Sequence, residues 1–182
     1  MKGIIFNLLS ESVIQEFGEN TWDDLLDAAG LDGAYTSLGS YDDAEIFKLV
    51  GVAAEKLMLP PDEVLRWLGR TAMPLLQKRY PGFFATHDNT RSFALTLNDI
   101  IHPEVRKLYP GAITPVFDFD NSNPEELVMG YQSARKLCAL AEGFLAGAAE
   151  HYGERLDFQQ PCCMNRGDEK CVFNLKFAKL ME

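Results

Sequence analysis

His102 and the Tyr-x-Ser-x-Arg cluster at residues 131–135 are the residues of this chain whose types and spacing best suit chemistry. A neutral imidazole is a good axial ligand for a haem iron. The hydroxyls of Tyr131 and Ser133 and the guanidinium fork of Arg135 can together donate hydrogen bonds to a pair of carboxylates. A buried haem needs both an axial ligand and partners for its two propionates. The two groups together therefore predict a haem site.

The segment before His102 determines how its imidazole is presented. An apolar helical stretch over about 90–101 precedes it, and Pro103 follows it. Because a proline disfavours helical geometry in the residue before it, we expect His102 at a helix end, with its ring aimed into the interior. A lone histidine in such a position is more often a satisfied core or cap residue. The cluster at 131–135 is what favours the ligand interpretation.

The cluster itself is predicted to lie where a strand ends and a helix begins. In a regular helix Ser133 would point away from Tyr131 and Arg135. At a strand-to-helix junction the three side chains can converge, with Ser133 as the N-cap of a helix over about 134–150 and Arg135 in its first turn. The helix N-terminus would then add a favourable potential for carboxylates.

Helical periodicity dominates residues 1 to about 110. The first helix is expected to end at Gly18 and the second at Gly30. A capping box from Thr21 to Asp24 is expected to open the second helix.

From residue 112 onward the pattern changes to the alternation that is typical of strands. Strands are predicted at 116–120 and 127–131, and two more between 155 and 177. The predicted fold class is α+β, in which an N-terminal helical part is followed by an antiparallel sheet crossed by a long helix.

Length and composition favour one domain over residues 1–182, divided into a helical subdomain 1–60 and a second subdomain 61–182. The chain is 47% hydrophobic and contains 12 Phe, which is enough for a core with room for an apolar cofactor. Its net charge of −10 should repel nucleic acids and anionic membranes. No apolar run is long enough to span a membrane. We therefore expect a cytoplasmic protein without nucleic-acid or membrane partners.

The histidine and the cluster resemble the H-NOX family (haem-nitric oxide/oxygen binding domains), and the resemblance runs through most of the chain. It implies haem b buried between the helical part and the sheet. His102 would be the protein ligand to iron, and Tyr131, Ser133 and Arg135 would clamp the propionates. A family proline that presses on the porphyrin is matched by Pro115, for which an ordinary proline at a strand start is the alternative.

The resemblance also implies a gas specificity. Oxygen-binding members carry a tyrosine as hydrogen-bond donor in the helix after the clamp. The equivalent position here is Leu140, with Phe144 one turn later, and neither side chain donates. Ile5, Leu9 and Leu76 are expected to complete an apolar wall. We therefore expect the protein to bind nitric oxide and carbon monoxide and to exclude oxygen.

The resemblance implies a sensor and not an enzyme. Release of His102 after nitric oxide binds would shift its helix and let the haem relax against Pro115. Residues 1–182 leave no room for an output domain, so signalling is expected in trans. Stand-alone bacterial members regulate histidine kinases or cyclic-di-GMP enzymes. The sequence contains no glycine-rich phosphate loop, G-x-S-x-G or H-E-x-x-H motif.

Four cysteines form a second candidate site. Cys162, Cys163 and Cys171 flank a predicted hairpin turn, and Cys138 lies in the preceding helix. In a reducing compartment this set suggests a tetrahedral zinc site, and some H-NOX proteins have one that loses its metal on oxidation. Strand neighbours point to opposite faces, so one of Cys162 and Cys163 is expected to be a bystander. Free thiols and a disulfide switch are the alternatives.

A competing resemblance comes from residues 162–173, which are similar to vinyl-reductase-type domains. Those domains bind small apolar molecules without haem, so this interpretation makes the protein a small-molecule binding module. His102 and the cluster distinguish the two interpretations, because a haem-free pocket would need neither.

Overall fold

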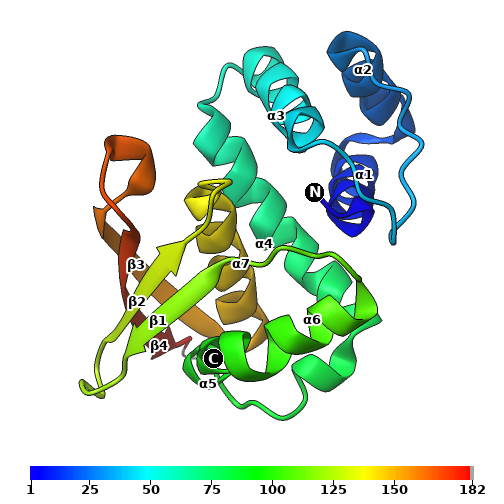
Figure 1. Ribbon diagram of the computed structural model, residues 1–182. Helices are drawn as coiled ribbons and strands as arrows, with labels where there is room; N and C mark the ends of the chain where they lie inside the picture. The colour runs from blue at the N-terminus through cyan, green and yellow to red at the C-terminus, as the bar shows by residue number, and fades with distance from the viewer. Residues whose placement is uncertain (181–182) are drawn as a thin grey trace.

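The computed structural model describes residues 1–180 as seven α-helices and a four-stranded antiparallel sheet (Figure 1). The helices are α1 (Gly3–Phe17), α2 (Glu19–Ala29), α3 (Asp43–Leu57), α4 (Pro61–Arg79), α5 (Thr90–Leu95), α6 (His102–Leu108) and α7 (Cys138–His151). The strands are β1 (Val116–Asp120), β2 (Leu127–Gln132), β3 (Glu154–Cys162) and β4 (Cys171–Lys179). The α+β fold class is thereby confirmed. None of the helices in this part of the chain is long and apolar enough to cross a membrane.

The strand order in the sheet is β1-β2-β4-β3, which leaves β1 and β3 at the edges. Phe117 of β1 lies opposite Tyr131 of β2, and Tyr131 lies opposite Cys171 of β4. The inward face of the sheet packs against α7, where Leu145 joins the buried side chains of β2 and β4. The alternation of buried and exposed residues along β4 is the pattern expected of a sheet with one covered face.

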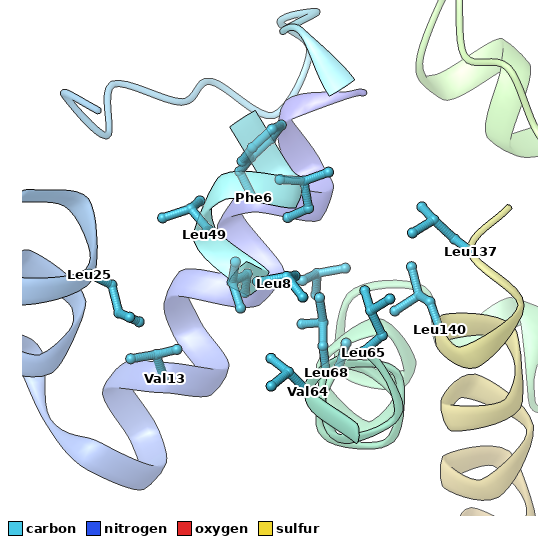
Figure 2. Close-up of a cluster of buried hydrophobic side chains, with 14 of the residues drawn as sticks. Phe6, Leu8, Val13, Leu25, Leu49, Val64, Leu65, Leu68, Leu137 and Leu140 are labelled. Carbon is cyan, nitrogen blue, oxygen red and sulfur yellow. The ribbon is translucent and has the colours of Figure 1, made fainter. Parts of the chain in front are cut away.

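The larger core lies among the N-terminal helices, α4 and the start of α7 (Figure 2). Phe6 and Leu8 of α1 and Leu49 of α3 are almost fully buried there. Leu68 of α4 and Leu140 of α7 complete the same cluster. Helix α4 therefore has a double role, because it packs on α1 and α3 and also lies beside α7.

Three glycines bring α4 and α7 unusually close together. A Cβ atom on Gly143 would lie 2.2 Å from the Arg66 carbonyl oxygen, and one on Gly69 would lie 2.4 Å from the Leu140 carbonyl oxygen. Gly147 makes a similar approach to α4. Backbone contact of this kind is possible only where the side chain is a hydrogen atom. The spacing of the two helices, and hence the position of Leu140, depends on these residues.

The predicted capping box at the start of the second helix is wrong. Helix α2 begins at Glu19, three residues earlier than the capping box requires, with Gly18 in the N-cap position. The Thr21 hydroxyl donates instead to the Phe17 carbonyl oxygen at 2.9 Å. The helix starts early because Gly18, with φ of +90°, turns the chain directly from α1 into α2. The end of α2 at Gly30, in the left-handed region, agrees with the prediction.

Candidate functional site

A cavity of about 450 Å³ is bordered by all the polar residues of the predicted haem site. His102, Pro115, Tyr131, Ser133 and Arg135 all line it. They come from the start of α6, the segment before β1, the end of β2 and the turn that follows. The volume lies within the range of cofactor pockets, roughly 300–1,000 Å³.

His102 lies inside a continuous helical segment and not at a helix end. Its φ of −65° and ψ of −38° are helical, so the prediction that Pro103 pushes it out of the helix is wrong. Residues Leu97–Ile101 form a π-helical turn immediately before it. The ring of a proline in an α-helix clashes with the carbonyl four residues earlier, and the wider π turn relieves this clash. The helix therefore continues through His102 into α6.

The His102 imidazole is buried and incompletely satisfied. Its Nδ1 atom is buried and has no hydrogen-bond partner within residues 1–180. Burial, aided by the charge of Arg106, lowers the pKa of His102 to about 4, and only a backbone contact with Pro115 acts in the opposite direction. The ring is therefore neutral near pH 7, and Phe117 stacks on it with 5.6 Å between centroids. An orphaned buried nitrogen on a neutral imidazole fits the requirements of an iron ligand.

The segment that follows Tyr131 forms a turn and not the start of a helix. The Lys136 N–H donates to the Ser133 carbonyl oxygen at 3.1 Å, and the Arg135 N–H donates to Ser133 Oγ at 3.3 Å. Ser133 is therefore not the N-cap of α7, which begins at Cys138 without a side-chain cap. Lys136 has a φ of +52°, and this left-handed geometry interrupts the helix. The expected contribution of a helix N-terminus at Arg135 is absent.

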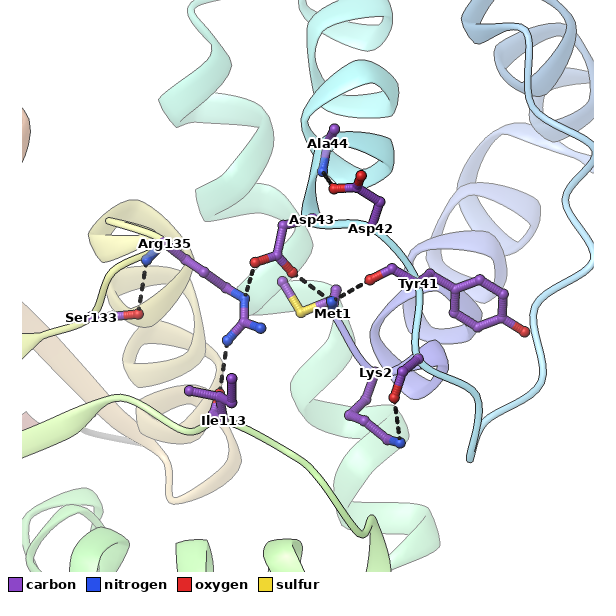
Figure 3. Close-up of polar contacts among 10 residues, drawn as sticks. Met1, Lys2, Tyr41, Asp42, Asp43, Ala44, Ile113, Ser133 and Arg135 are labelled. Carbon is purple, nitrogen blue, oxygen red and sulfur yellow. Dashed lines mark hydrogen bonds and ion pairs between the residues drawn. The ribbon is translucent and has the colours of Figure 1, made fainter.

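Arg135 is held at the cavity by a network that the sequence did not predict (Figure 3). Its Nε donates to Asp43 Oδ2 at 2.8 Å, and its Nη1 donates to the Ile113 carbonyl oxygen at 2.9 Å. Asp43 also accepts a hydrogen bond from the amino group of Met1. Although burial acts to raise it, the amino group and Arg135 lower the pKa of Asp43. In the described chain Nη2 of Arg135 makes no protein hydrogen bond, so it can bind an added carboxylate.

Four of the five predicted wall residues line the cavity. Ile5, Leu76, Leu140 and Phe144 are among its lining residues. Leu9 is not among the residues that line the cavity in the described chain, so the prediction that it forms part of the apolar wall is wrong. It is buried in the helical core, because neighbouring residues of a helix point about 100° apart. Leu8 contributes to the wall of the cavity in its place.

Two tyrosines in the wall of the cavity, Tyr80 and Tyr109, were not predicted from the sequence. The hydroxyls of Tyr80, at the end of α4, and Tyr109, just after α6, are hydrogen-bonded to each other and border the cavity. Burial raises the pKa of Tyr109, and the contact with Tyr80 raises it further, so the Tyr109 phenol keeps its proton. The wall is therefore not free of hydroxyl groups, although one of the two protons is used within the pair.

Three of the four cysteines come together beside the sheet. The Sγ atoms of Cys138, Cys163 and Cys171 lie within 4.8 Å of one another, and all three side chains are buried. Cys162 is half-buried and lies outside this group in the described chain. Burial raises the pKa of Cys138 to about 12, although Gln160 opposes the shift by hydrogen bonding. The Gln160 side chain, which lies against Cys138, was not anticipated.

Comparisons with known proteins point to a single family. A family model described as "Haem-NO-binding" matches residues 2–160. An H-NOX protein from S. oneidensis in the Fe(II)NO ligation state is similar with a TM-score of 0.92 and 32% identity, over 98% of this chain and 100% of that chain. The unliganded Fe(II) H-NOX protein from K. algicida has a TM-score of 0.88 and 26% identity, over 100% and 99%. The H-NOX domain from Shewanella oneidensis in the Fe(II)CO state has a TM-score of 0.89 and 31% identity, over 98% and 99%.

Proposed function

Because this chain belongs to the haem-NO-binding (H-NOX) family, a family of haem-based gas sensors, we propose that its cavity holds haem b and that the protein senses nitric oxide. The observation that carries the proposal is a single cavity that is lined by the buried imidazole of His102 and by the donors of Tyr131, Ser133 and Arg135. When bound, the haem would supply the ferrous iron to which a diatomic gas attaches.

Each polar residue has a distinct role in this proposal. His102 would hold the iron through its neutral imidazole. Tyr131, Ser133 and the free Nη2 of Arg135 would bind the propionates. Asp43 keeps Arg135 oriented, so the clamp depends on α3 as well as on the turn after β2. Pro115 borders the cavity and would press on the macrocycle.

We propose that the wall favours nitric oxide and carbon monoxide and excludes oxygen. Bound oxygen carries more polar charge than the other two gases and gains more from a hydrogen-bond donor. Leu140 and Phe144, with Ile5 and Leu76, offer an apolar surface without a donor. The Tyr80–Tyr109 pair is the alternative source of a donor in this wall.

The direct test is an absorption spectrum of the purified, dithionite-reduced protein with nitric oxide, carbon monoxide or air. A Soret band that shifts with the first two gases and not with air supports the proposal. A protein from haem-supplied cells that is colourless and takes up no haem would support the haem-free small-molecule module instead. Stable oxygen binding would contradict the selectivity and would point to the Tyr80–Tyr109 pair.

Replacing Leu140 by tyrosine is expected to allow oxygen binding. The new hydroxyl would lie in the wall of the cavity, where Leu140 is now buried. A hydrogen bond to a charged group contributes about 1.5–3 kcal/mol, which corresponds to a roughly tenfold to hundredfold slower dissociation of oxygen. Stopped-flow kinetics of the ferrous protein measure this rate. Leu140→Phe is the control, and equal rates for the two variants would show that the hydroxyl has no part.

We propose that the signal leaves the protein through α6. If His102 is released, α6 loses its attachment to the haem and can move relative to β1. The output would be read in trans by a histidine kinase or a cyclic-di-GMP enzyme, as the family resemblance suggests. We also propose that the protein has no catalytic role and a cytoplasmic location, and that it is divided into subdomains 1–60 and 61–182.

A second proposal concerns zinc at the cysteine group. It is supported by three buried Sγ atoms within 4.8 Å of one another, a spacing that suits thiolate ligands to one ion. We expect about one zinc per chain in protein purified under reducing conditions, as measured by elemental analysis. Cys171→Ser should remove most of the metal, whereas Cys162→Ser should retain it. Equal zinc contents in these two variants would refute this assignment of ligands.

A further inference from the structure

Asn98 connects the helical segment of His102 to the edge of the sheet. It lies in the π-helical turn Leu97–Ile101, which leads directly into His102. Its Nδ2 donates to the Phe117 carbonyl oxygen at 2.5 Å, and its Oδ1 accepts from the Phe117 N–H at 3.2 Å. Strand β1 is an edge strand whose other side pairs with β2. The Asn98 amide therefore takes the place that a neighbouring strand would have at Phe117.

Phe117 in turn contacts both halves of the proposed haem site. Its ring stacks on the His102 imidazole at 5.6 Å between centroids, with 29° between the planes. It also lies opposite Tyr131 in the register of β1 and β2, with 5.7 Å between the ring centroids. A single residue thus touches the proposed iron ligand and the proposed propionate clamp, and Asn98 fixes the backbone of that residue.

The two hydrogen bonds between Asn98 and Phe117 join the π-helical turn before His102 to β1, and without them these two elements would be free to separate. A π turn is less regularly bonded than an α-helix, and such turns are frequent at functional sites. The Phe117 N–H and carbonyl group face away from β2 toward Asn98, so loss of the amide would expose both groups on the open edge of the sheet. The two bonds together therefore resist any movement of the His102 segment away from β1.

We propose that Asn98 is a positioning residue for His102, which holds the imidazole in its direction and opposes its release. The inference rests on the proposed haem function. Without the Asn98 bridge, the turn before His102 loses its attachment to Phe117, and the imidazole should be held less firmly against the iron. The residue acts through Phe117 and the turn, and it need not touch the haem.

The test compares Asn98→Ala with Asn20→Ala, a change of the same type at an exposed site in α2. In the haem-free protein, hydrogen exchange of the Phe117 amide should be roughly fivefold faster in Asn98→Ala only, because one hydrogen bond contributes about 1 kcal/mol. In the ferrous haem protein, resonance Raman spectra should show the iron–histidine band at lower frequency. The fraction of nitric oxide complex that lacks the histidine ligand should rise.

The exchange rate of Phe117 and the iron–histidine band together decide whether Asn98 positions His102. Faster Phe117 exchange with an unchanged iron–histidine band would show that Asn98 is only a structural residue and would overturn the proposal. Unchanged exchange would overturn it as well. If unaltered protein takes up no haem, the proposed function fails first, and the missing Soret band identifies that case. If Asn98→Ala does not fold, Asn98→Asp keeps the acceptor for the Phe117 N–H and should shift the band in the same direction.

Discussion

Replacing Gly143 by alanine is expected to destabilise the fold strongly, because it forces two packed helices apart. The new Cβ would lie 2.2 Å from the Arg66 carbonyl oxygen, and this atom belongs to the backbone of α4. A backbone atom cannot move aside by changing rotamer, so α4 and α7 must separate. Overpacking of this kind costs about 1–3 kcal/mol and occasionally more, and we expect the upper end.

Thermal unfolding measures this effect. For a chain of this size, about 3 kcal/mol corresponds to a fall in Tm of roughly 6–12 °C. Gly51→Ala is the matched control, because Gly51 is also within a helix but has no atom within 4 Å of the added Cβ. This control should gain about 0.5–1 kcal/mol from helix propensity. Similar Tm values for the two variants would contradict the close packing of α4 and α7.

The same variant is informative about the cavity. Leu140 and Phe144 flank Gly143 in α7, and both line the cavity. A separation of α4 from α7 would therefore move the apolar wall as well as weaken the core.

Replacing His102 by alanine is expected to remove the protein ligand to iron. The His102 Nδ1 atom has no hydrogen-bond partner in residues 1–180, so the substitution breaks no hydrogen bond of that atom, and its cost to the haem-free fold is the cavity that the ring leaves. Loss of the proposed bond between His102 and the iron should reduce haem retention at least roughly tenfold, or about 1.4 kcal/mol. The measurement is haem transfer to an excess of apomyoglobin, followed at the Soret band.

Two controls make the result specific. His151→Ala alters an exposed histidine at the end of α7 and should leave haem retention unchanged. Added imidazole should restore haem retention in His102→Ala, because the substitution leaves a space of that shape beside Phe117. Unchanged retention in His102→Ala, with a normal iron–histidine band, would show that another group binds the iron.

The sequence by itself determined the candidate chemistry and the order of elements. Strand alternation in β1 and β2 and the breaks at Gly18 and Gly30 are local patterns, and each agrees with the structure. His102 and the clamp were recognised because a haem requires those residue types. The structure places all of them, with Pro115, around one cavity, and their roles toward haem remain predictions.

The tertiary structure alone decided how these residues are held. A proline favours a helix boundary, but the π turn before His102 accommodates it because Asn98 and Phe117 hold that turn against β1. Likewise, Arg135 depends on Asp43, which lies far away in the sequence. No local pattern predicts a pairing between such distant segments.

The cysteines and the wall of the cavity show the same limit. Alternation in a strand predicts that Cys162 and Cys163 face opposite ways, but only the packing of α7 on the sheet selects Cys163 to join Cys138 and Cys171. Helical periodicity places both Leu8 and Leu9 on the inner side of α1, but only the tertiary structure shows that Leu8 lines the cavity and that Leu9 lies in the helical core. Periodicity specifies which face of an element is buried, whereas the neighbour that covers it depends on contacts between segments that are distant in the chain.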